Sequence, residues 1–253
     1  NITDTASELG GDGDAVLSFV DAGMNSTRKS MPVFFARRAA IEPMIQQTFG
    51  KSLTEIEMEI DTTLKPIVGA ITNWTAKGEA KLIQTKTEVK NVVGILEGVG
   101  DLKDETIVVG AHYDHLGYGG QGSLAPWTKD IHNGADDNSS GTSALLEIAQ
   151  QLATRKTPSR RRVVFIAFSA EERGLIGSAR YVKEPLIALD KTIAMVNLDM
   201  VGRLTDNKLI VTGTGTSDVW DPLLDKLNDT AKFEMTRKPE GVGPSDHQSF
   251  YLK

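Results

Sequence analysis

The sequence predicts an α/β fold, in which helices cover both faces of a doubly wound, mostly parallel sheet and so build three layers. Three apolar runs, at residues 106–111, 163–168 and 193–198, are rich in Val and Ile and lack alternating polar positions. Such runs are typical of strands that are buried on both faces of a parallel sheet. From Thr106 onward these runs alternate with helical patterns, as they do in doubly wound sheets.

The chain before Thr106 is predicted to begin with a loop. Residues 1–30 are rich in Gly, Asp, Ser and Thr, which favours loop structure. Asp12 and Asp14 in this segment could suggest calcium, but the twelve-residue loop ending in Glu that such a site needs is missing. A plain loop is therefore the simpler interpretation.

Hydrophobic patterns and capping signals predict the other elements. In chain order they are a strand at 32–35, a helix at 36–49, a helix from 53 to 60, a strand pair at 79–96, a helix at 142–152, a strand at 208–211 and a helix from 222 to 228. The second helix has the clearest start, because Ser52 and Glu55 form a capping box. Pro66 ends the early helical module. We therefore expect an appended segment at residues 1–66 and a main domain at residues 67–253.

Composition excludes several classes of protein. The 253 residues carry 28 basic and 34 acidic side chains, a net charge of −6, with no basic stripe or nucleic-acid motif, so no nucleic-acid partner is expected. No apolar run is long enough to span a membrane. Without cysteine, any metal ion must be held by imidazole and carboxylate groups. The lack of cysteine also suits an exported protein. The chain starts with Asn and shows no signal peptide, so we expect a processed or trimmed, exported product.

The most informative motif is a pair of adjacent carboxylates, Glu171 and Glu172, that follows the apolar run at 163–168. Neighbouring side chains on an extended chain point to opposite sides, so one carboxylate can hold a metal ion while the other moves protons. Metal-assisted hydrolysis needs this division of labour. The pair could also simply open a helix, because the helix dipole favours Glu in a first turn.

Four more residues of metal-ligand type lie at comparable places, namely His112, Asp137, Asp199 and His247. Each has an ordinary alternative. His112 could be an ordinary hydrogen-bonded histidine, and Asp137 could be a helix N-cap. Asp199 could pair with Arg203, and His247 could be part of a turn. Their convergence with Glu172 in one domain predicts a metal site, and nitrogen and oxygen donors of this kind suit zinc, although cobalt or manganese would fit similar donors.

Five strings of residues resemble the M28 family of di-zinc aminopeptidases in their order and spacing. They are GAHYDHLG at 110–117, NGADDNSSG at 133–141, AFSAEERGLIG at 167–177, NLDMVG at 197–202 and SDHQSF at 245–250. The resemblance covers the chain from about Asn91 to its end. It implies the zinc-exopeptidase fold, which is of the phosphorylase/hydrolase-like type, and a hydrolase that removes N-terminal residues from peptides.

The resemblance implies two zinc ions per chain. His112 and Asp199 would hold one ion, Glu172 and His247 would hold the other, and Asp137 would bridge the two.

Two further roles follow from the resemblance. Glu171 corresponds to the general base, which takes a proton from a water between the ions and delivers it to the leaving amine. Asp114 corresponds to the residue that accepts the second ring N–H of His112 and so orients this ligand. His115 and Asp136 are interpreted as neighbours with a supporting or structural role.

Several alternatives stay open. Family members usually continue past Lys253 with a further core strand and a loop carrying Tyr and His, so the chain resembles a C-terminally truncated one. Its N-terminal part resembles the segment that follows a protease-associated domain.

A related amidase or deacylase, a glutaminyl-cyclase-like acyltransferase and an inert binding module share the fold. Because all five expected ligands and Glu171 are present, the peptidase is favoured. The preferred N-terminal residue and the oligomeric state are left open.

Overall fold

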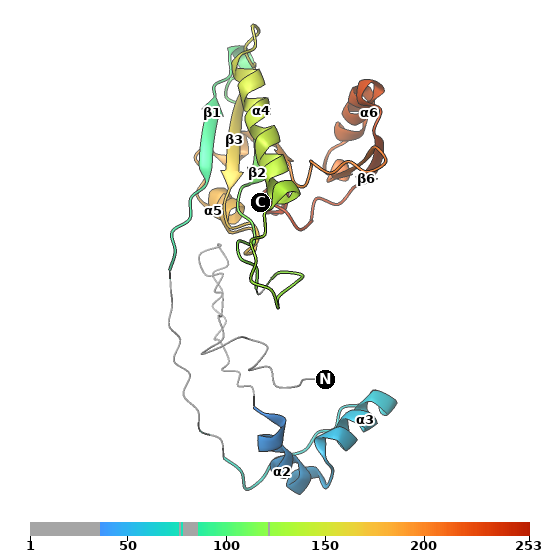
Figure 1. Cartoon of the computed structure of the whole chain (residues 1–253). Helices are drawn as coiled ribbons and strands as arrows, with labels where there is room; N and C mark the ends of the chain where they lie inside the picture. Colours follow the sequence, from blue (N-terminus) through green and yellow to red (C-terminus); the bar gives the residue numbers. More distant parts are fainter. Residues whose placement is uncertain (1–35, 76, 78–85, 121) are drawn as a thin grey trace. The chain divides into compact units, whose positions relative to one another are not determined.

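The computed structural model describes residues 36–75, 77, 86–120 and 122–253 (Figure 1). The predicted loop at 1–30 with Asp12 and Asp14, the strand at 32–35 and residues 79–85 of the strand pair at 79–96 lie outside the described residues. In the described remainder of that pair, only residues 92–96 form a strand, and residues 86–91 do not. Among the described residues, contacts define one compact unit that ends at Lys86 and a second that begins at Thr87. The division into segments 1–66 and 67–253 stays a prediction.

In its described residues, the first unit contains two helices, α2 (Arg38–Phe49) and α3 (Leu53–Thr63). The predicted capping box opens α3: the Ser52 hydroxyl accepts the Glu55 N–H at 3.2 Å, and the Glu55 carboxylate accepts the Ser52 N–H at 2.7 Å. The Arg38 guanidinium pairs with a carboxylate of α3 at 2.7 Å and so links the two helices.

The second unit is built on a four-stranded mixed sheet in the order β1-β3-β2-β4. Its strands are β1 (Val92–Leu96), β2 (Thr106–His112), β3 (Arg162–Phe168) and β4 (Thr192–Asn197). β2 runs parallel to both of its neighbours, and only β1, at one edge, is antiparallel to β3. The three apolar runs of the sequence are thus the three parallel strands.

Helices cover both faces of this sheet (Figure 1). On one face, α4 (Gly141–Ala153) places Leu145 against Val109 of β2 and Phe165 of β3. On the other face, the adjacent strand residues Val108, Ile166 and Phe168 pack with Tyr181 of α5 and with Phe250 of α7, and the helices α5 and α7 span Ile176–Lys183 and His247–Tyr251. Consecutive strand residues therefore enter two separate cores, which confirms the predicted α/β class.

The remaining strands form a second, two-stranded sheet. β5 (Lys208–Thr212) runs parallel to β6 (Glu234–Lys238), and α6 (Trp220–Ala231) connects them. Short turns complete the unit: η2 (Gly100–Leu102), η3 (Ala135–Ser140), η4 (Leu189–Lys191) and η5 (Thr214–Thr216). Within the described part of the chain, no helix combines the length and apolar character needed to cross a membrane. The sequence patterns did not predict α5, β6 and α7.

Candidate metal centre

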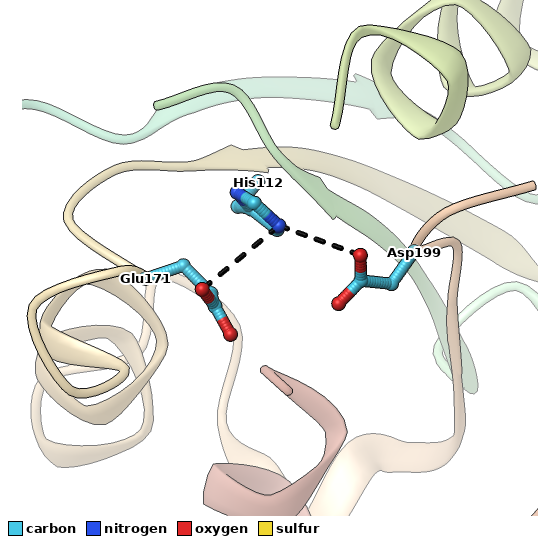
Figure 2. Close-up of side chains that lie close together, drawn as sticks. All are labelled: His112, Glu171 and Asp199. Atoms are coloured by element: carbon cyan, nitrogen blue, oxygen red, sulfur yellow. Dashed lines mark ion pairs between the residues drawn. The ribbon is translucent and has the colours of Figure 1, made fainter. Parts of the chain in front are cut away.

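The parallel strands bring three predicted site residues to one edge of the main sheet. His112 ends β2, Glu171 lies just beyond β3, and Asp199 lies just beyond β4, so all three meet where the carboxyl ends of parallel strands lie together. His112 Nε2 is 3.5 Å from Asp199 Oδ1 and 3.9 Å from Glu171 Oε2 (Figure 2). The imidazole is only 1% exposed, so these carboxylates face a ring nitrogen that water hardly reaches.

Asp137 adds a carboxylate between two histidines. The turn η3 is interrupted by non-helical backbone angles at Asp137 and Asn138, just before α4 begins. Asp137 Oδ1 lies 3.1 Å from His112 Nε2, while Asp137 Oδ2 lies 3.8 Å from His115 Nδ1. A single carboxylate therefore faces donors on both sides of the site.

A second group of donors lies beside the first. His115 Nδ1 is 2.6 Å from Glu172 Oε1, and ligand atoms of His115, Asp137 and Glu172 all lie within 4.8 Å of one another. Ligand atoms of His112, Glu171 and Asp199 form the other such group. The adjacent glutamates 171 and 172 thus point at different histidines.

Asp114 holds the turn that carries both glutamates. Its carboxylate accepts the backbone N–H groups of Glu171 at 3.1 Å and of Glu172 at 3.3 Å. The Nδ1 atom of His112 lies 3.1 Å from the Asp114 carbonyl oxygen and 3.7 Å from its carboxylate. Ala170, immediately before the pair, has φ +56°, which is unfavourable for a residue with a side chain. The hydrogen bonds of Asp114 help to hold this strained turn.

Asn138, which is 2% exposed, ties the Asp137 turn to the loop that carries Asp199. Its amide donates to the Leu198 carbonyl oxygen at 3.0 Å, and its own oxygen accepts the N–H groups of Gly141 at 3.0 Å and Met200 at 3.2 Å. These bonds fix two predicted ligands relative to each other, a role that the sequence did not reveal.

His247 begins α7 and belongs to neither donor group. Its Nε2 atom is buried without a hydrogen-bond partner among the described residues, and so is Asp199 Oδ1. The other oxygen of Asp199 accepts the Ser245 hydroxyl at 2.6 Å. Buried acceptor atoms without a partner are costly in a folded protein, and a bound cation would satisfy them.

The electrostatics also favour a cation. Burial opposes protonation of His112, but Asp114, Asp199 and Glu171 outweigh it and raise its pKa to about 11. Burial, together with Asp246, Asp199 and Glu172, raises the pKa of Glu171 to about 8. Glu171 is therefore held among like charges that oppose its ionisation, and a bound cation would offset this repulsion.

The donor set fits zinc. Zinc binds imidazole nitrogen and carboxylate oxygen at about 2.0–2.2 Å, and tetrahedral geometry then separates neighbouring donors by roughly 3.3–3.6 Å. The distances from His112 Nε2 to Asp199 Oδ1, 3.5 Å, and to Asp137 Oδ1, 3.1 Å, lie close to this range. The residues are thus suited to such an ion in chemistry and in spacing.

Comparison with known proteins identifies the family of the chain. Residues 91–253 match the model of peptidase family M28. The chain is 34% identical over 163 residues to Aminopeptidase YwaD of Bacillus subtilis. This match covers 62% of this chain and 28% of that protein. It is also 31% identical over 167 residues to Probable glutamate carboxypeptidase LAMP1 of Arabidopsis thaliana. That match covers 64% of this chain and 21% of the relative.

A solved structure is similar as well. BSAP, a zinc aminopeptidase from Bacillus subtilis, matches with a TM-score of 0.50 and 34% identity, over 64% of this chain and 37% of that one. The chain thus spans less than half the length of these relatives. Because the family model matches well over half of the chain, the protein belongs to peptidase family M28.

Proposed function

We propose that the protein is an aminopeptidase that removes N-terminal residues from peptides with the help of two zinc ions. Family membership and relatives named as aminopeptidases support a peptide substrate. The observation that carries the two-metal proposal is the position of Asp137 between proposed ligands of both ions. Its Oδ1 atom lies 3.1 Å from His112 Nε2, and a ligand atom of Asp137 lies within 4.8 Å of one of Glu172. A carboxylate shared by two ions needs this kind of placement.

His112 and Asp199 would hold one ion, Glu172 and His247 the other, and Asp137 would bridge them. The buried atoms Asp199 Oδ1 and His247 Nε2, which have no hydrogen-bond partner within the described part of the chain, support two of these assignments. The 2.6 Å hydrogen bond from Ser245 to Asp199 Oδ2 leaves Oδ1 as the oxygen that can face an ion.

Glu171 is the proposed general base. When bound, the zinc ions would polarise the scissile carbonyl and acidify the attacking water. Glu171 would take the proton from this water and deliver it to the leaving amine. Burial and the neighbouring carboxylates raise the pKa of Glu171 above that of an exposed glutamate, so its ionised carboxylate is a stronger base toward this proton. Asp114, which accepts the N–H groups of Glu171 and Glu172, keeps the base and its neighbour in place.

The test combines metal content with peptide cleavage. Elemental analysis should find two zinc ions per chain, and a panel of aminoacyl anilides should be hydrolysed while their N-acetylated counterparts are not. The N-acetyl series is the matched control, because it removes only the free amine. One tightly held ion per chain would contradict the two-zinc centre, and equal cleavage of acetylated substrates would contradict an aminopeptidase and favour an amidase or deacylase.

A further inference from the structure

We propose that His115 is a positioning residue for the second metal ion: its ring N–H holds the carboxylate of Glu172 so that one carboxylate oxygen stays directed at the ion. This inference rests on the two-zinc centre proposed above. The sequence resemblance assigns no ligand or catalytic role to His115.

The contact defines the hydrogen bond. His115 Nδ1 lies 2.6 Å from Glu172 Oε1, whereas the next carboxylate oxygen, Asp137 Oδ2, is 3.8 Å away. An ionised carboxylate has no hydrogen to give, so the ring nitrogen must be the donor. A bond this short between imidazole and carboxylate belongs to the strong, charge-assisted kind. Both side chains are about four-fifths buried, which limits competition from water.

The same distance argues against His115 as a ligand of the ion that Glu172 binds. Two donors on one tetrahedral zinc ion lie roughly 3.3–3.6 Å apart. The 2.6 Å between His115 Nδ1 and Glu172 Oε1 is well below this separation and is normal for a hydrogen bond. Glu172 therefore has one oxygen occupied by the histidine and the other available to a metal ion.

The imidazole is held in place from two other directions. Gly134 lies so close to the ring that a Cβ atom built on it would come within 2.8 Å of His115 Cγ. The ring of His132 lies with its centre 6.2 Å from that of His115. The backbone N–H of His132 donates to the Gly117 carbonyl oxygen at 2.7 Å, which closes the loop between the two histidines. These neighbours limit the positions that the His115 ring can take.

The experiment compares His115→Ala with His115→Asn. The amide nitrogen of asparagine takes nearly the position of Nδ1 and can donate to Glu172, but an amide nitrogen is not a zinc ligand. Stepwise zinc dissociation constants of the metal-free full chain are measured against a competing chelator, for wild type and both variants. Co²⁺ absorption spectra report the geometry of each site independently of activity.

His115→Ala should lower the affinity for one zinc ion by about 10–100-fold and leave the affinity for the other within about threefold of wild type. His115→Asn should recover most of the lost affinity. The unaffected ion also serves as the control for folding. Equal losses in both variants would show that His115 is itself a ligand, and unchanged affinities in His115→Ala would show that the ring only fills space. Either result overturns this inference while two ions in wild type still support the proposed function. A single ion in wild type would overturn both.

Discussion

Replacing Asn138 by alanine should weaken the fold and the metal centre together. The side chain makes three hydrogen bonds. Two join the Asp137 turn to the Asp199 loop, with Leu198 at 3.0 Å and Met200 at 3.2 Å, and the third, with Gly141 at 3.0 Å, lies within its own segment. Alanine makes none of them and leaves three backbone groups without these partners. Because Asn138 is 2% exposed, water cannot easily replace it.

The magnitude follows from the bonds lost. A typical intramolecular hydrogen bond contributes about 0.5–1.5 kcal/mol, so three bonds amount to roughly 1.5–4.5 kcal/mol of unfolding free energy. We expect a loss of about 2–4 kcal/mol in the metal-free protein. Since Asp137 and Asp199 would no longer be held relative to each other, zinc affinity should also fall by about 10–100-fold, as is common when residues that support metal ligands are changed.

Urea unfolding of the metal-free chain and zinc titration of the native chain measure the two effects. Asn228→Ala is the matched control. Asn228 makes similar hydrogen bonds, to the N–H and the carbonyl oxygen of Phe233, but it lies in α6, beside the two-stranded sheet of β5 and β6. This control should lose stability and keep its zinc affinity. A stability loss in Asn138→Ala below about 1 kcal/mol, or zinc binding as tight as in wild type, would refute the reasoning.

Other changes test the remaining assignments. Glu171→Gln should keep both ions while turnover falls by roughly 10²–10⁴-fold, whereas Glu172→Gln should lose one ion; the opposite pattern would mean that the pair is assigned wrongly by one residue. Asp137→Ala should lose both ions in elemental analysis, and retention of one ion at full occupancy would show that Asp137 does not bridge. Zinc should release at least one proton at pH 7, because it displaces the proton that a pKa of about 11 keeps on His112, and its affinity should fall as the pH is lowered. Calorimetry in buffers of different ionisation enthalpy measures this release, and a value of zero would contradict it.

The sequence alone determined the parallel core and one helix start. Strands β2 and β3 are largely buried on both faces, so each is a continuous apolar run that can be identified without the tertiary structure. β4 is also a continuous apolar run, but the expectation that it is buried on both faces was wrong: it lies at the edge of the sheet, and Ile193 and Val196 are exposed. The start of α3 was equally clear, because a capping box is a local motif. β6, by contrast, reads Glu-Met-Thr-Arg-Lys, with every second residue exposed, and α7 is a single short turn of helix. Neither leaves a periodic pattern long enough to recognise.

The same distinction holds for the candidate site. The sequence supplied the types of donor and their places after the strands, because parallel strands must end at one edge of their sheet. Only the tertiary structure decided which donors meet. His115 contacts Glu172 across 57 positions, and Asn138 reaches the Leu198 carbonyl oxygen across 60. Such contacts depend on the order and register of the strands and on the path of the loops between them, and no local pattern in the sequence encodes these features.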